Sequence, residues 1–75
     1  MMRLPALKAR EVLQVLERAG YYVDHVTGSH YIMRHPERPG RVTVAFHGDR
    51  DIKRAVLASI IKQAGMTVEE FLRLR

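Results

Sequence analysis

Apolar residues at helical spacing mark the first element of the chain. The apolar stripe between Leu7 and Ala19 is formed by Val12, Leu13, Leu16 and Ala19. Charged and amide side chains fill the remaining positions, which is the pattern of an amphipathic helix. Gly20 follows at the place where a left-handed C-cap ends a helix, so the sequence predicts a helix that stops there.

Stretches rich in β-branched and aromatic residues predict a three-stranded sheet after this helix. Tyr21 to Val26 and Ser29 to Arg34 are separated by Thr27-Gly28, which is the pattern of a β-hairpin. The segment from His35 to Gly40 contains two prolines, which lack the N–H that a strand ladder needs, so it is predicted to be a loop. Arg41 to Val44 then alternate as the third strand.

A second helix is predicted after the sheet. Its apolar stripe between residues 57 and 64 has the i, i+3, i+4, i+7 spacing of a helix, and Gly65 ends it. Asp49 or Asp51 precedes the stripe, and either one is expected to cap the start of this helix.

A capping box predicts a short last helix. Thr67 and Glu70 have the required spacing, and Met66 and Phe71 stand where the accompanying hydrophobic staple would be. We therefore expect residues 1–75 to form a single α+β domain with the order α-β-β-β-α, a three-stranded antiparallel sheet and a short C-terminal helix. This is the layout of a double-stranded-RNA-binding-domain-like fold, which contacts RNA by shape and phosphate.

Charge and composition point to a polyanionic partner inside the cell. The 13 Lys and Arg residues exceed the 8 Asp and Glu residues, which gives a net charge of +5. A basic balance that serves only solubility is the alternative. Cysteine is absent, so disulfides and thiolate metal sites are excluded and a reducing compartment, the cytoplasm, is expected. Met1 to Leu7 lacks the apolar run of a signal peptide, and no stretch approaches the roughly 20 apolar residues of a membrane span.

Histidines are the candidate reactive groups, because imidazole titrates near neutral pH. The four are His25, His30, His35 and His47. His30 follows Gly28-Ser29 at the start of the second strand, and a type I turn with a bulge at Gly28 would place Asp24 opposite it as an orienting carboxylate. A two-residue turn would instead place His25 opposite His30, in which case zinc binding by the two rings is a rival interpretation.

Two groups of basic residues are candidate phosphate contacts. They are Arg34, Arg38 and Arg41 around the second loop, and Arg50, Lys53 and Arg54 at the start of the second helix. Solvated turn and helix faces would give the same pattern. No Gly-rich phosphate loop and no HExxH pair occurs, so P-loop nucleotide hydrolysis is excluded, and neither a resident metal nor another cofactor is expected.

An ordered set of motifs along nearly the whole chain resembles the HicA toxin family, also called YcfA-like. The motifs are Gly20-Tyr21, Gly28-Ser29-His30, Arg41 to Val44, His47-Gly48 and Leu57 to Gly65. The resemblance implies an mRNA interferase that a HicB-type antitoxin neutralises by covering a catalytic histidine, and that histidine corresponds to His30. The family often has Pro where this chain has Ala45, and Gly where it has Ala55.

The resemblance and the chemistry of imidazole together predict a metal-independent endoribonuclease. His30 would take the proton of a 2′-hydroxyl, whose oxygen then attacks the neighbouring phosphorus. Supporting or RNA-binding roles are expected for Gly28, Ser29, Arg34, Arg41, His47, Lys53 and Arg54. Two alternatives remain: a non-catalytic RNA-binding module on the same fold, and a protein-interaction or metal-binding domain.

Overall fold

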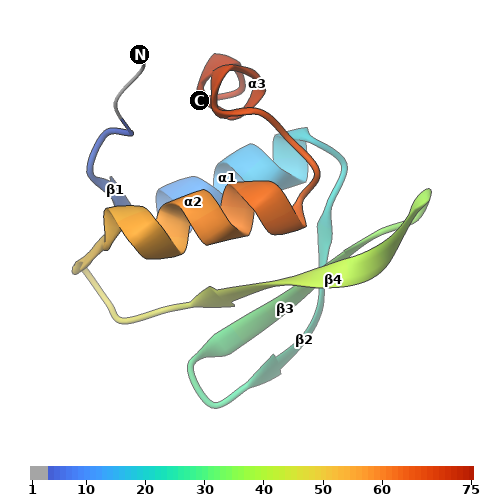
Figure 1. The fold of residues 1–75 in the computed structure, drawn as a ribbon. Coiled ribbons are helices and arrows are strands. Elements are labelled where there is room, and N and C mark those ends of the chain that lie inside the picture. Colours follow the sequence, from blue (N-terminus) through green and yellow to red (C-terminus); the bar gives the residue numbers. More distant parts are fainter. Residues whose placement is uncertain (1–3) are drawn as a thin grey trace.

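A computed structural model describes residues 4–75 (Figure 1). The first three residues of the Met1–Leu7 segment therefore lie outside the described residues. The elements in chain order are β1 (Leu7–Lys8), α1 (Ala9–Arg18), β2 (Tyr22–Thr27), β3 (His30–His35), β4 (Arg38–Ala45), β5 (Asp51–Ile52), α2 (Arg54–Gln63) and α3 (Val68–Arg73). The predicted α-β-β-β-α layout and the short last helix are confirmed.

The helices lie on one side of an antiparallel sheet in the order β2-β3-β4 (Figure 1). Met33, Val42 and Val44 of the sheet are at most 1% exposed and pack against the apolar faces of α1 and α2. Strand β2 lies at the edge and is exposed along its whole length. Because side chains alternate along a strand, His30, Ile32 and Arg34 lie on the sheet face away from the helices.

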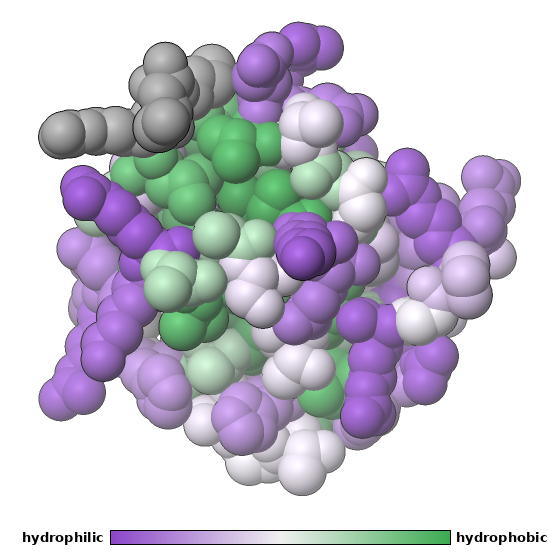
Figure 2. Space-filling view, in the orientation of Figure 1, coloured by the Kyte–Doolittle hydropathy of each residue, from purple (hydrophilic) through white to green (hydrophobic). Residues whose placement is uncertain are grey.

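Hydrophilic and apolar residues are unevenly distributed over the surface. On the face seen in Figure 1, hydrophilic side chains project around the periphery, and the main apolar area lies in the upper part, over the helical half (Figure 2). On strand β2, Tyr22, Val23 and Val26 are each between 40% and 48% exposed. Apolar surface therefore remains on the edge of the sheet, where no helix covers it.

A small second sheet, formed by β1 and β5, is absent from the sequence prediction. Leu7 pairs with Ile52, and this extended pairing makes α1 begin at Ala9 rather than at Leu7. The backbone N–H of Lys8 donates to the Glu11 carboxylate at 3.1 Å, so α1 starts without a Ser, Thr, Asp or Asn cap.

Both predicted caps of α2 are wrong. The helix begins after Lys53, whose side chain makes no capping hydrogen bond. Asp51 belongs to β5 and lies 3.6 Å from the Lys8 ammonium, and Asp49 accepts a hydrogen bond from the Arg10 guanidinium at 3.1 Å. Lys8 and Arg10, at the start of α1, therefore bind the two carboxylates that the sequence predicted to cap the start of α2.

The register of the β2–β3 hairpin differs from both predicted registers. Gly28 and Ser29 form a two-residue turn, so Thr27 pairs with His30. Gly28 has a φ of +58°, and glycine with positive φ in the first turn position suits a type II′ turn, which needs only two residues. A bulge at Asp24 shifts the pairing between Val23 and His25, so Asp24 is not opposite His30.

The predicted loop from His35 to Gly40 is also wrong. Only Pro36 and Glu37 form the turn, and β4 already begins at Arg38, which pairs with His35. Between this pair and the next one, Met33 with Val42, the register shifts. Pro39 lies in that irregular stretch, where no regular ladder hydrogen bond requires its missing N–H.

Predicted signals at the helix ends are confirmed for α1 and α3. Gly20 follows α1 with a φ of +99°. At α3, the Glu70 backbone N–H donates to Thr67 Oγ1 at 3.1 Å, and the Thr67 N–H donates to the Glu70 carboxylate at 2.9 Å. The Thr67 backbone N–H bond is the largest cause that lowers the pKa of Glu70 below its ordinary value, ahead of the Thr67 side chain. Phe71 is fully buried and anchors α3 to the core.

Candidate functional site

His30 stands at the end of the sheet, directly after the two-residue turn. Its neighbours across the strands are Thr27 on β2 and Ala45 on β4, and its side chain is exposed. Phe46 holds the strand end from the β4 side, because its N–H donates to the Ser29 carbonyl at 2.7 Å and its ring lies 5.4 Å from the Tyr31 ring. The fixed backbone thus presents an imidazole on an open face.

Gly28 and Ser29 shape the backbone that carries His30, and they do so through their main-chain atoms. Gly28 takes the positive φ of the turn, and a side chain added there would meet nothing within 4 Å. Ser29 supplies the carbonyl that extends the pairing of β3 with the segment after β4. The two residues therefore fix the backbone at the strand end that carries His30, and their supporting role in RNA handling stays a prediction.

A cavity of about 270 Å³ begins beside Ala45, the strand partner of His30. Its lining residues are Ala45, His47, Arg50, Asp51, Ile52, Lys53 and Val56. Apolar groups from β4, β5 and α2 form one part of the wall, and the basic side chains come from the loop before β5 and from the residue that precedes α2. Asp51 is the one acidic residue of the lining, and its carboxylate lies 3.6 Å from the Lys8 ammonium. Such a mixed lining suits a ligand with an apolar ring and an anionic group.

The predicted supporting residues do not all gather here. His47 and Lys53 line the cavity, whereas Arg54 is exposed on the first turn of α2 and does not contribute to the lining. Arg34 lies four residues along β3 from His30, a separation of roughly 13 Å in a strand. Arg41 lies on β4 in the irregular stretch that faces Arg34. The two arginines are therefore at the far end of the sheet.

The other two histidines have local partners. His25 Nδ1 lies 2.8 Å from the Asp24 carboxylate and pairs in the sheet with Ile32, so it does not stand opposite His30. His35 Nε2 lies 3.2 Å from the Ala19 carbonyl, and its ring packs edge-on against Tyr21. Within residues 4–75 there is no group of three or more His, Cys, Asp or Glu side chains that would hold a metal ion.

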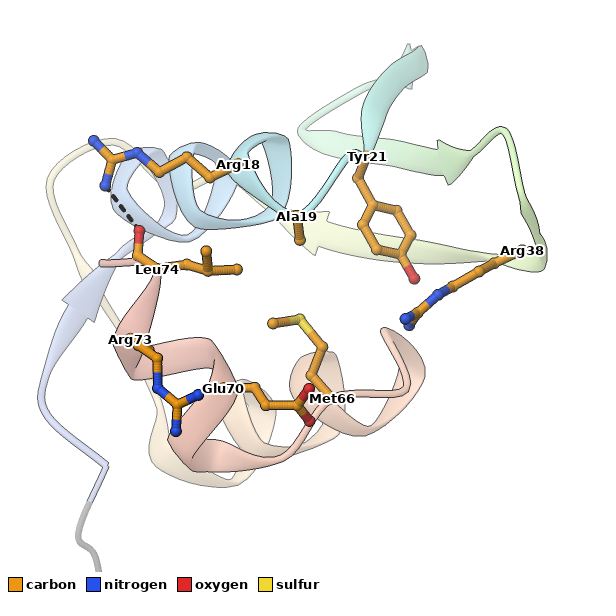
Figure 3. A pocket seen from close by; sticks show the side chains of 8 residues that line it. All are labelled: Arg18, Ala19, Tyr21, Arg38, Met66, Glu70, Arg73 and Leu74. Carbon is orange, nitrogen blue, oxygen red and sulfur yellow. Dashed lines mark hydrogen bonds between the residues drawn. The ribbon is translucent and has the colours of Figure 1, made fainter.

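A larger cavity, about 340 Å³, lies between the end of α1, the start of β4 and α3 (Figure 3). Two of the three arginines that line it, Arg18 and Arg38, bind the C-terminal ends of helices. Arg18 donates to the Leu74 carbonyl at 2.8 Å, and Arg38 donates to the Ala64 carbonyl at 2.8 Å. Leu74 and Ala64 are the C-caps of α3 and α2, where a cation satisfies free carbonyls and the negative end of the helix dipole. Sequence reasoning missed this role, because both contacts are long-range.

Comparison with models of known protein families shows to which family the chain belongs. The model of one family, described as HicA toxin of bacterial toxin-antitoxin, matches residues 9–66. The chain belongs to the HicA toxin family. Among curated proteins no match is found.

The matched region of this HicA chain contains the whole candidate site. Gly28, Ser29, His30 and His47 lie within it, as do all residues that line the smaller cavity. Helix α3 follows the matched region and is fixed by its own capping box and by Phe71. None of the helices in the described part of the chain is long and apolar enough to cross a membrane.

Proposed function

We propose that this HicA toxin is a metal-independent endoribonuclease that acts on mRNA, with His30 as the general base. The observation that carries the proposal is the position of His30, an exposed imidazole on a fixed strand end beside a cavity with basic residues. A neutral imidazole that takes the 2′-hydroxyl proton contributes roughly 10² to 10⁴ in rate. The oxygen then attacks the adjacent phosphorus and a 2′,3′-cyclic phosphate forms.

Basic side chains near His30 stabilise the reaction electrostatically. The phosphorus passes through a five-coordinate state that carries more negative charge than the starting phosphodiester, and cations fixed nearby lower the energy of that state. Lys53 and Arg50 line the cavity that begins at Ala45 and supply this charge. Arg54 and the more distant Arg34 and Arg41 contact the flanking phosphates of the strand.

The proposed partner is a HicB-type antitoxin that covers His30. Family membership supports a toxin–antitoxin pairing. An exposed histidine on the uncovered sheet face is accessible to a protein as well as to RNA. We propose that residues 1–75 act as one HicA-like unit and that toxin and antitoxin meet in the cytoplasm, where mRNA is translated.

A non-catalytic RNA-binding module on the same fold is the second candidate. Within residues 4–75 the His30 ring has no hydrogen-bond partner that would orient it, whereas His25 has Asp24. The histidine that has a carboxylate partner is therefore His25, which does not line the cavity. If the module interpretation is correct, RNA binds the same surface and is not cleaved.

Cleavage of end-labelled single-stranded RNA in excess EDTA tests the proposal. Native protein is expected to cut the RNA and leave cyclic-phosphate ends, and His30→Ala is expected to bind RNA but not cut it. His25→Ala is the matched control, because His25 is also exposed on the sheet and should be dispensable. A DNA strand of the same sequence lacks the 2′-hydroxyl and should remain intact. Binding without cleavage by the native protein would establish the module interpretation instead.

A further inference from the structure

We infer that His47 is the general acid of the reaction, and that the cavity it lines receives the nucleoside on the 3′ side of the cleaved bond. This inference rests on the proposed ribonuclease function. In-line attack by the 2′-oxygen expels the 5′-oxygen on the opposite side of the phosphorus. The group that protonates the 5′-oxygen must therefore stand across the phosphate from His30.

The strand register brings His47 close enough to His30 for this role. Ala45 is the direct neighbour of His30 across β3 and β4, and His47 follows two residues later. The hydrogen bond from the Phe46 N–H to the Ser29 carbonyl extends the pairing beyond Ala45. Diagonal neighbours on paired strands have Cα atoms about 7–8 Å apart. That spacing allows the two imidazoles to flank one phosphate, each at hydrogen-bond distance of about 2.6–3.2 Å from its oxygen.

The cavity extends from Ala45 and His47 towards β5 and the start of α2. Ala45 and His47 both line it, and Ile52 and Val56 add apolar wall. Its volume of about 270 Å³ is close to the lower limit of small-molecule pockets, about 300 Å³, which suits a single nucleoside better than a longer piece of RNA. Val56 is 45% exposed on α2, and a base that packs against it removes apolar surface from water.

The proton and electron balance of the step is complete with these two residues. The 2′-hydroxyl proton moves to neutral His30, the 2′-oxygen forms a bond to phosphorus, and the bond from phosphorus to the 5′-oxygen breaks. The electron pair of that bond stays on the 5′-oxygen, which takes a proton from the His47 imidazolium. The products are a 2′,3′-cyclic phosphate and a 5′-hydroxyl, and exchange with water resets both rings.

Two neighbours of His47 are weaker candidates for the acid. Arg50 offers a guanidinium group, a type of side chain that serves as a hydrogen-bond donor and not as a proton donor in proteins. Lys53 also lines the cavity, but an ammonium group at this place acts mainly by neutralising phosphate charge. The His47 side chain is exposed, and the contacts that hold its segment do not use the imidazole ring, among them the backbone hydrogen bond from the Arg50 N–H to the His47 carbonyl and the bond from the Lys8 ammonium to the Asp49 carbonyl. Replacement of the side chain should therefore leave the fold intact.

An RNA with sulfur in place of the 5′-bridging oxygen at one position tests the inference. A thiolate leaves without protonation, so loss of the general acid should matter only for the oxygen substrate. His47→Ala is expected to lower the cleavage rate of the oxygen RNA about 10²- to 10⁴-fold and that of the sulfur RNA less than about tenfold. His30→Ala should slow both substrates strongly. Lys53→Gln is the control for charge and should slow both substrates by a similar factor.

The outcomes separate this inference from the proposed function. If native protein cuts both RNAs, His30→Ala cuts neither, and His47→Ala is equally slow on both or as fast as native, then the ribonuclease function stands and His47 is not the acid. If native protein cuts neither RNA, the proposed function itself fails and the inference fails with it. Selective rescue of Lys53→Gln by sulfur would assign the acid role to Lys53.

Discussion

Replacement of Gly20 by alanine should be much more costly than replacement of Gly28, although both glycines have positive φ. A non-glycine residue in the left-handed region loses about 1–2 kcal/mol, and this applies to both positions. At Gly28 an added Cβ meets nothing within 4 Å. At Gly20 it would lie 2.6 Å from Nε2 of His35, so the His35 ring must move.

Movement of the His35 ring removes two further interactions. The first is the hydrogen bond between His35 Nε2 and the Ala19 carbonyl, with a typical net contribution of about 0.5–1.5 kcal/mol. The second is the edge-on packing of His35 against Tyr21, with centroids 5.1 Å apart, which contributes a similar amount. The expected loss is therefore about 2–5 kcal/mol for Gly20→Ala, against about 1–2 kcal/mol for Gly28→Ala.

Urea unfolding followed by circular dichroism measures the difference. A domain of this size has a total stability of about 4–11 kcal/mol, so Gly20→Ala should shift the midpoint far to lower urea at an unchanged slope. Equal losses for the two variants would refute the reasoning, because they would mean that the His35 contacts contribute nothing to stability. If the His35 contacts do contribute, adding His35→Ala to the Gly20→Ala variant should reduce the free energy of unfolding only slightly further, since the same contacts are already lost.

Three further predictions concern α3 and the cavity beside His30. Phe71→Ala should reduce the free energy of unfolding by about 3–5 kcal/mol, because the ring is fully buried, whereas the partly buried Leu72 should tolerate alanine better in the same urea assay. Hydrogen bonds from Thr67 lower the pKa of Glu70, so its contribution to stability is present above about pH 4.5 and is lost as the pH falls below that value. Glu70→Gln should therefore show a flatter dependence of the unfolding midpoint on pH between 5 and 3, and an unchanged acid-side slope would contradict this assignment. RNA affinity should fall with salt, and Lys53→Gln should reduce the slope of log K against log salt by about one in a filter-binding titration, whereas a slope equal to that of native protein would remove Lys53 from the phosphate contacts.

Local sequence signals predicted the helices and the general layout correctly. Gly20 and Gly65 end their helices with positive φ, and the Thr67 and Glu70 capping box forms as predicted, because these signals act within a few residues. The β1–β5 pairing was not predictable in this way. It joins Leu7 and Lys8 to Ile52 and Asp51, and a strand of two residues is too short to show an alternation of apolar and polar positions.

Pairing register limited the prediction of the site. The sequence identified His30 as the candidate, but its partners depend on whether the turn contains two or three residues, and Gly28 fits both kinds of turn. Asp49 and Asp51 have the residue type of helix caps, yet basic groups about 40 residues away at the start of α1 bind them. The cavity beside Ala45 exists only because β4, β5 and α2 meet, so no local pattern indicates it.

The missing cap of α2 has a consequence for hydrogen exchange near the candidate site. The first backbone hydrogen bond of this helix, from the Leu57 N–H to the Lys53 carbonyl, has no capping side chain to support it. Its amide protons should therefore exchange through a small local opening, long before the buried core opens. Lys53 and Val56 belong to this turn, so two parts of the cavity wall can adjust to the RNA strand that is proposed to bind there, while the core of the toxin stays folded.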